Sequence, residues 1–189
     1  IVSADGADNT RGILIEKSNY DNITFNTVTV NGTGGSGGIN NNNGIIILDG
    51  SNNIVNSNTI SAYGYANGYD VGIQSLGTNN TITANTIFTS GSLRNIGMII
   101  SGGFNNIISN VIYPSGLGVD NYGIDISSSN KSIISNNTIS TIGSTNNYGI
   151  SIGFRDYDNI ISGNIISTKG TKDNYGIISM NSNFNSFTL

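Results

Sequence analysis

Two stretches, YGIDISSSNKSIISNNTI at residues 122–139 and YGISIGFRDYDNIISGNII at residues 148–166, decide the fold because they are two copies of one pattern. Each copy ends with an Asn that is followed two positions later by Ile. The same frame, with Val or Ile after the Asn, recurs along the chain at Asn26, Asn58, Asn85, Asn110, Asn137 and Asn164. The last three intervals are 25, 27 and 27 residues, which indicates an internal repeat.

A second marker keeps step with the first and shares no residue with it. It is a Gly followed by a large apolar residue, and its copies are Gly12-Ile13, Gly44-Ile45, Gly72-Ile73, Gly97-Met98, Gly123-Ile124, Gly149-Ile150 and Gly176-Ile177. Two markers in step over 189 residues leave no room for a second domain or a linker. We therefore expect one repeat domain over residues 1–189, as a segment of a longer protein or as a polymerising subunit.

The residues around each marker predict short β-strands. The first and third positions after the marker Gly are mostly Ile, as in Ile124 and Ile126, and this spacing presents one face of a strand inward. A second strand is expected further on, where Ile134 lies three positions before Asn137. No 3.6-residue helical pattern lies between them, so each repeat is expected to form one rung of a parallel β-solenoid.

The marker Asn lies in a polar stretch between two inward apolar positions. Stacked rungs place equivalent residues over each other at a spacing of about 4.8 Å. At that spacing the side-chain amide of one Asn can bond both the turn backbone and the Asn of the next rung. We therefore interpret the six marker Asn residues as a structural ladder that closes the turns.

The quoted units resemble the right-handed parallel β-helix repeats of pectin-lyase-like proteins, of NosD-type carbohydrate-binding and sugar-hydrolase modules, and of adhesin-like surface proteins. The resemblance covers essentially the whole chain. It implies an all-β fold, a single-stranded right-handed parallel β-helix of about seven rungs. It implies little about activity, because unrelated functions are carried by such scaffolds.

Composition excludes several classes of function. Charged residues make up 10% of the chain, against roughly 25% in an average protein. The net charge is −4 and the seven Lys and Arg residues are scattered singly, so nucleic acid is not an expected partner. No apolar run is long enough to span a bilayer, so membrane insertion is not expected.

The chain contains no Cys and no His. Disulfides and thiolate metal sites are therefore excluded, and the commonest general base and metal ligand is missing. We expect no metal and no cofactor, with calcium on clustered carboxylates as the weak alternative.

One group of charged residues is the candidate catalytic site. It consists of Asp125, Arg155, Asp156 and Asp158 on consecutive rungs, with Lys131 nearby. The resemblance implies that enzymes of this type use such carboxylates on the outside of one sheet. We favour solvated turn charges, and a catalytic pair or a calcium site stays as the alternative. The polygalacturonase pattern of an Asp pair beside a His is not present.

The outward face of the strand that follows the marker Gly is unusually apolar. Its large aliphatic members are Leu14, Ile46, Ile99 and Ile178. An apolar stripe on a β-surface indicates that something covers it. The expected cover is either residues 31–43 folding over the stripe or a lateral contact with another domain or subunit, and a ligand groove is the minor alternative.

Two surface features concern ligands and location. Five glycosylation sequons permit a secreted location, at Asn22, Asn31, Asn79, Asn130 and Asn136.

Tyrosines in the loops are suited to sugar stacking, and they are Tyr63, Tyr65, Tyr69, Tyr113, Tyr122, Tyr148, Tyr157 and Tyr175. Those that directly precede a marker Gly are expected to stack on one another instead.

The expected function is a non-enzymatic extracellular or cell-surface rod, as a structural or adhesive module of an adhesin, surface layer or filament. The alternative is a carbohydrate-active enzyme or polysaccharide-binding module. Val2 occupies the repeat position of Ile139, and Phe187 that of Ile134, so both ends are bare rungs. Bare rungs are expected to stack on neighbouring domains or on identical subunits head to tail.

Overall fold

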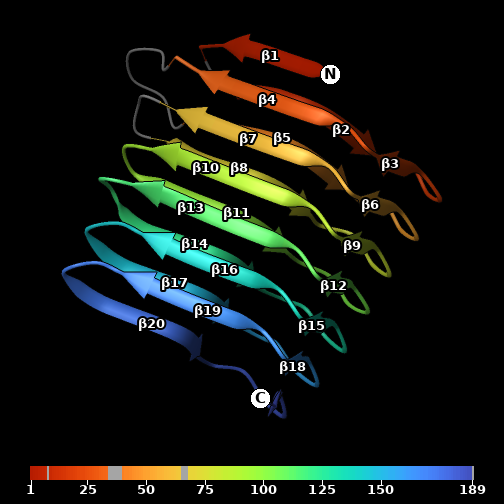
Figure 1. The fold of residues 1–189 in the computed structure, drawn as a ribbon. Coiled ribbons are helices and arrows are strands. Elements are labelled where there is room, and N and C mark those ends of the chain that lie inside the picture. Colours follow the sequence, from red (N-terminus) through yellow and green to blue (C-terminus); the bar gives the residue numbers. More distant parts are fainter. Residues whose placement is uncertain (8, 34–39, 65–67, 189) are drawn as a thin grey trace.

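The computed structural model describes residues 1–7, 9–33, 40–64 and 68–188, and it confirms a parallel β-solenoid of about seven turns (Figure 1). These residues form three parallel sheets of seven strands each and contain no helix. The two termini lie at opposite ends of the stack of rungs. The fold class expected from the repeat is therefore correct.

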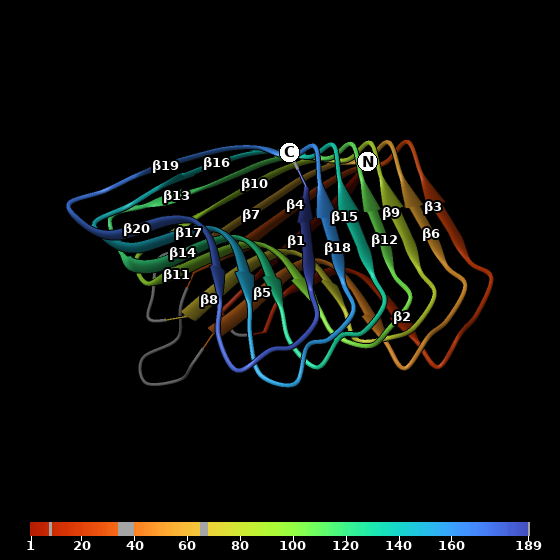
Figure 2. The ribbon, with the colours of Figure 1, turned by 90° about the horizontal axis from the view of Figure 1, so that it is seen from below.

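Each sheet takes one strand from every rung. Sheet A contains β1 Val2–Gly6, β4 Thr27–Gly32, β7 Thr59–Gly64, β10 Thr86–Gly91, β13 Val111–Gly116, β16 Thr138–Ile142 and β19 Ile165–Lys169. Sheet B contains β2 Arg11–Glu16, β5 Asn40–Leu48, β8 Gly68–Ser75, β11 Arg94–Ile100, β14 Val119–Ile126, β17 Thr145–Ile152 and β20 Lys172–Ser179. Sheet C contains β3 Asn22–Thr24, β6 Ile54–Asn56, β9 Thr81–Thr83, β12 Asn106–Ile108, β15 Ile133–Ser135, β18 Ile160–Ser162 and β21 Ser186–Thr188. The chain passes through sheets A, B and C in turn and then returns to A one rung further on, as Figure 2 shows from below.

Neighbouring strands pair with equivalent residues opposite each other. In sheet A, Ile87 pairs with Ile60 on one side and with Ile112 on the other. In sheet B, Met98 pairs with Ile124. Equivalent side chains therefore stack along the axis, as the repeat predicts.

The core consists of aliphatic columns that run along this axis. Its largest fully buried side chains are Ile45, Ile47, Ile60, Ile73, Ile82, Ile87, Met98, Ile100, Ile107, Ile112, Ile124 and Ile126. Full burial of one such side chain contributes about 1.5–3 kcal/mol. Burial of these columns is therefore the main stabilising term of the fold.

The rung has three strands, whereas the sequence predicts two. The residue before each marker Asn adopts a positive φ, which is 56° at Phe25 and Ser57, 54° at Ala84 and 57° at Ser109. This left-handed conformation costs roughly 1–2 kcal/mol at a non-Gly residue and turns the chain through a corner. The corner divides the expected second strand into a sheet C strand and a sheet A strand.

From Gly12 to Gly149, the marker glycines of sheet B pack directly against an aliphatic side chain of sheet A. A Cβ on Gly44 would collide with the side chain of Ile60 and would lie 2.6 Å from the carbonyl oxygen of Gly72. The same conflict recurs at Gly97, where Ile112 is the opposing side chain. Close packing between two sheets therefore explains this marker.

Candidate functional site

The six marker Asn residues form the first amide column, in the corner between sheets C and A. From Asn26 to Asn137, the Nδ2 of each marker Asn donates to the Oδ1 of the next at 2.9–3.1 Å, and its backbone N–H donates to the same oxygen at 2.9–3.0 Å. From Asn58 onward each Nδ2 also donates to a carbonyl oxygen of the preceding rung, such as that of Ile82 for Asn110, at 2.9 Å. The side chain of Asn110 therefore links three successive rungs. Its amide has no hydrogen-bonding capacity left for a ligand.

A second amide column, which the sequence reasoning missed, lies where sheet C begins. Its side-chain oxygens accept the backbone N–H of the preceding rung at 2.8–3.0 Å, and its members are Asn53, Asn80, Asn105, Ser132, Asn159 and Asn185. A signal was present, because the first five lie five positions before a marker Asn. Ser132 interrupts the run of Asn residues and obscures this frame.

A third amide column lies inside sheet B, two positions before each marker Gly. It contains Thr10, Asn42, Asp70, Asn95, Asn121, Asn147 and Asn174. Its Asn side chains bond along the axis at 2.7–3.0 Å. Asp70 is its one acidic member. Burial raises the pKa of this carboxyl to about 7, although the hydrogen bond from Asn42 lowers it.

A column of glycines makes room for the third amide column. It lies six positions after each marker Asn and contains Gly32, Gly64, Gly91, Gly116, Gly143 and Gly170. A Cβ on Gly143 would collide with Nδ2 of Asn121, and a Cβ on Gly91 would collide with the Asp70 carboxyl. The amide column and the glycine column are therefore one packing unit.

Among the predicted catalytic residues, Asp125 points outward from β14 beside Ser151 of the next rung. Burial raises the pKa of the Asp125 carboxyl, and a hydrogen bond with Ser151 and the charge of Arg94 oppose the shift. The negative charge of Asp156 adds to the rise, so these two predicted residues interact electrostatically.

The other predicted charges are differently placed. The two carboxylate oxygens of Asp156 accept the backbone N–H groups of Ser129, at 2.6 Å, and of Gly153, at 2.8 Å, so this carboxyl closes a turn. Burial raises its pKa, although both hydrogen bonds lower it. The Arg155 guanidinium lies over the ring of Phe154, with its Cζ 5.0 Å from the ring centroid.

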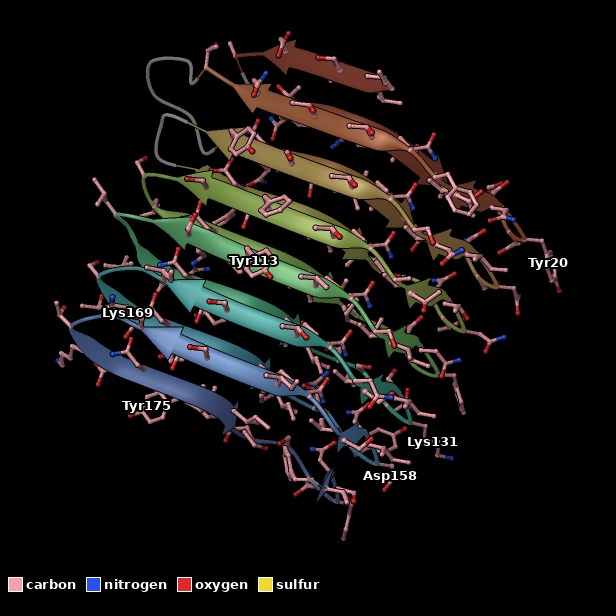
Figure 3. All side chains as sticks on the ribbon, viewed as in Figure 1. Tyr20, Tyr113, Lys131, Asp158, Lys169 and Tyr175 are labelled. Atoms are coloured by element: carbon pink, nitrogen blue, oxygen red, sulfur yellow. The ribbon has the colours of Figure 1, made fainter. Side chains whose placement is uncertain are left out.

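Asp158 and Lys131 are exposed, and Figure 3 shows them at the same edge of the stack. The Lys131 ammonium lies 5.7 Å from the ring centroid of Phe104. Among the described residues no group of three or more carboxylates is arranged to hold a metal ion. Within the predicted catalytic group, Asp125 is therefore the one carboxyl that points outward from a strand and has a raised pKa.

The predicted apolar stripe on sheet B is uneven. Leu14 is 42% exposed and Ile46 only 4%, whereas Ile99 and Ile178 are half-buried. Residues 34–39, which belong to the segment expected to fold over the stripe, lie outside the described part of the chain. A lateral contact at this stripe stays a prediction.

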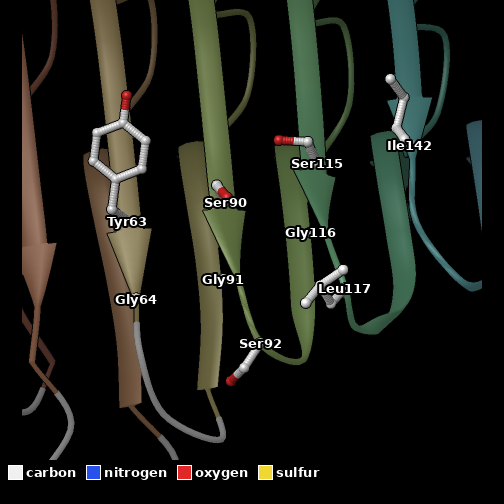
Figure 4. A pocket seen from close by; sticks show the side chains of 9 residues that line it. All are labelled: Tyr63, Gly64, Ser90, Gly91, Ser92, Ser115, Gly116, Leu117 and Ile142. Carbon is white, nitrogen blue, oxygen red and sulfur yellow. The ribbon is translucent and has the colours of Figure 1, made fainter.

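A groove on the outer face of sheet A was not predicted. It has a volume of about 600 Å³, and its lining residues are Tyr63, Gly64, Ser90, Gly91, Ser92, Ser115, Gly116, Leu117 and Ile142 (Figure 4). Register places Tyr63, Ser90, Ser115 and Ile142 on successive strands at one level. Gly64, Gly91 and Gly116 of the glycine column also line the groove. We call this feature the sheet A groove.

Aromatic rings stack beside this groove and in sheet B. Phe88 and Tyr113 stack on adjacent strands of sheet A, with ring centroids 5.4 Å apart and an interplanar angle of 19°. In sheet B the ring of Tyr148 lies 5.0 Å from that of Tyr122 and 5.7 Å from that of Tyr175. Tyr65 lies outside the described residues.

The five sequon asparagines differ in accessibility. Asn22, Asn79 and Asn136 are exposed, whereas Asn31 and Asn130 are half-buried. The Nδ2 of Asn130 donates to the hydroxyl of Tyr157 at 2.8 Å. Glycosylation at these positions stays a prediction.

The fold and the three amide columns define the class of the molecule, a parallel β-solenoid with internal polar ladders. The chain matches no family profile, no curated protein and no solved structure. No helix in the described part of the chain is long and apolar enough to cross a membrane.

Proposed function

We propose that this chain is a non-enzymatic extracellular rod, the structural or adhesive module of an adhesin, surface layer or filament. The observation that carries the proposal is the continuity of the stack: three sheets bond each rung to the next, and three polar columns add side-chain hydrogen bonds between rungs. Stacked rungs of this kind give a stiff element whose length is set by the number of repeats.

The test combines accessibility and protease resistance. Antibodies against the chain are expected to label intact cells that carry the natural protein, and proteinase K is expected to leave the solenoid undigested. Labelling that appears only after cell lysis would contradict the extracellular location. Digestion as fast as that of an unfolded chain would contradict a rigid rod.

The proposed partners of the rod are neighbouring domains or identical subunits. Ile177 and Phe187 of the last rung are 39% and 49% exposed beside a hollow of about 290 Å³ that Ile161 also lines. A surface that stacked on this rung would bury them. Sedimentation at rising concentration tests assembly of identical subunits, and a monomer at every concentration would contradict it.

A polysaccharide-binding module is the second candidate, and the sheet A groove favours it. The groove combines the ring of Tyr63 with the hydroxyls of Ser90 and Ser115 beside three glycines. Phe88 and Tyr113 add partly exposed rings on the same face. Aromatic faces and hydroxyls at one surface suit a sugar polymer, whose rings are apolar on their faces and polar at their edges.

Affinity electrophoresis in gels that contain neutral or acidic polysaccharides tests this candidate. If the groove binds one of them, Tyr63→Ala is expected to weaken binding about tenfold, because this ring lines the groove and an aromatic contact contributes about 1 kcal/mol or more. Tyr20→Ala is the control, since Figure 3 shows this tyrosine at the far edge of the stack. Equal loss of binding in both variants would contradict binding in the groove.

The enzymatic alternative depends on Asp125. Turnover of an acidic polysaccharide that disappears in Asp125→Ala would support it. Turnover that persists in this variant would exclude the predicted catalytic group.

A further inference from the structure

The third amide column contains one residue that does not fit its hydrogen-bond pattern. Asp70 pairs in register with Asn42 of the preceding rung and with Asn95 of the following one. Its side chain is buried, with 2% of the residue exposed. Ionised carboxylates are almost never buried so deeply unless a cation is paired with them.

The column has a direction. The Nδ2 of Asn95 donates to Oδ1 of Asn121 at 2.8 Å, and Asn121 and Asn147 continue in the same sense. Asn42 likewise donates from Nδ2 to Oδ1 of Asp70 at 2.8 Å. An Asn at position 70 would therefore pass the pattern on by donating to Asn95.

A carboxylate at position 70 cannot make that donation, because it only accepts. The break is visible in the structure, since Oδ1 of Asn95 is buried and has no hydrogen-bond partner. A buried acceptor without a partner costs about 1–3 kcal/mol.

We propose that Asp70 is a proton-binding site of the folded solenoid, and that its neutral carboxyl donates an O–H to Oδ1 of Asn95. The proton comes from solvent when the chain folds and returns to solvent when the carboxyl ionises. Ionisation sets an anion against the carbonyl oxygen of Asn95 and weakens the link between these two rungs. Position 70 thus makes the stability of the stack depend on pH, whatever the function of the rod.

No cation in the described structure compensates an anion at this position. Among the described residues of the elements packed against β8, the strands β5 and β10 contain no titratable side chain. The remaining groups are Tyr63 of β7, Tyr69 of β8 itself, and Arg94 of β11. Arg94 precedes the inward Asn95 and so points to the opposite face, where its guanidinium bonds Asp120 at 3.0 Å.

The raised pKa of Asp70, about 7, agrees with this geometry. A carboxyl whose pKa is raised in the folded state stabilises the fold fully below its ordinary pKa of 3.8. This stabilisation is lost as the pH rises from about 4, where the carboxyl ionises in the unfolded chain, to about 7, where it ionises in the folded protein as well. Above pH 7 the stability does not fall further through this group.

The experiment compares the natural protein with Asp70→Asn, which preserves the shape and restores a permanent donor. Their melting temperatures are expected to be similar at pH 4, and the variant is expected to be more stable by about 5 °C or more at pH 8. Other carboxyls titrate in both proteins, so their effects cancel in the difference. Asp49→Asn, at an exposed position, controls for the loss of one charge.

A second measurement needs no variant. The carboxyl carbon of Asp70 in the ¹³C-labelled natural protein is expected to titrate with a midpoint near pH 7. A midpoint near pH 4, or a stability difference that does not change with pH, would overturn the proposal. Either result would mean that Asp70 is ionised and that the amide of Asn95 points the other way, toward it.

Discussion

At the scale of the residue, the fold depends on the first amide column, whose interior members use all their side-chain hydrogen bonds. The side-chain amide of each interior Asn donates to one oxygen in the preceding rung and to one in the following rung. Its side-chain oxygen accepts two hydrogen bonds from the Asn of the preceding rung, one from the amide and one from the backbone N–H. Ser could not reach both neighbours, which explains why Asn occupies every position of this column. A buried amide that loses its partner leaves several groups unsatisfied at once.

Replacing a central member of the first column tests this role. Asn110→Ala removes bonds to Asn85, Asn137 and Ile82, and is expected to lower the free energy of unfolding by about 3 kcal/mol or more. Asn106→Ala, at a half-buried outer position of β12, is the matched control and is expected to cost about 0.5 kcal/mol or less. Denaturant titration measures both, and equal costs would contradict the ladder.

Residue-scale prediction from sequence succeeded where one residue type repeats without exception. The marker Asn does so in six rungs, and its ladder could be predicted with its bonding partners. Thr10 and Asp70 interrupt the third column, and Ser132 interrupts the second, so neither frame was recognised. Each substitution keeps a side-chain oxygen but changes the residue type, and only Ser132 accepts a backbone N–H, that of Asn105.

At the scale of the element, sheets A and B fit together because a glycine column faces an amide column. Neither column could exist without the other, since a side chain at the glycine position would occupy the space of the amide. Sequence could not predict the corner that separates sheets C and A. Its positive φ is adopted by residues as different as Phe25, Ser57 and Ala84, so composition carries no signal for it.

The paired columns predict a position-specific cost for adding one methyl group. Gly143→Ala is expected to destabilise the fold by about 1–3 kcal/mol, because its Cβ would collide with Asn121 and would lie 2.6 Å from Oδ1 of Asn147. Gly153→Ala is the control, since the nearest atom to its Cβ, the carbonyl oxygen of Ile126, is 3.4 Å away. A variant at Gly143 as stable as the one at Gly153 would contradict this packing.

At the scale of the whole molecule, each rung contacts only its neighbours within the described part of the chain, and the fold is a stack held at many equivalent points. The repeat predicted this architecture and its approximate number of rungs. It did not predict the sheet A groove, whose lining residues come from four neighbouring strands of sheet A. Which residues of these strands lie side by side depends on the three-strand rung, and the sequence predicts only two strands. Finding this groove therefore needed the coordinates, whereas predicting the scaffold did not.

Hydrogen exchange of the side-chain amides tests the central claim, that buried amide columns lock the rungs in register. In the ¹⁵N-labelled protein, the Nδ2 hydrogens of Asn85, Asn110 and Asn137 are expected to exchange about a thousandfold more slowly than those of Asn106. Exchange of all four side chains at the rate of a free amide would contradict the account.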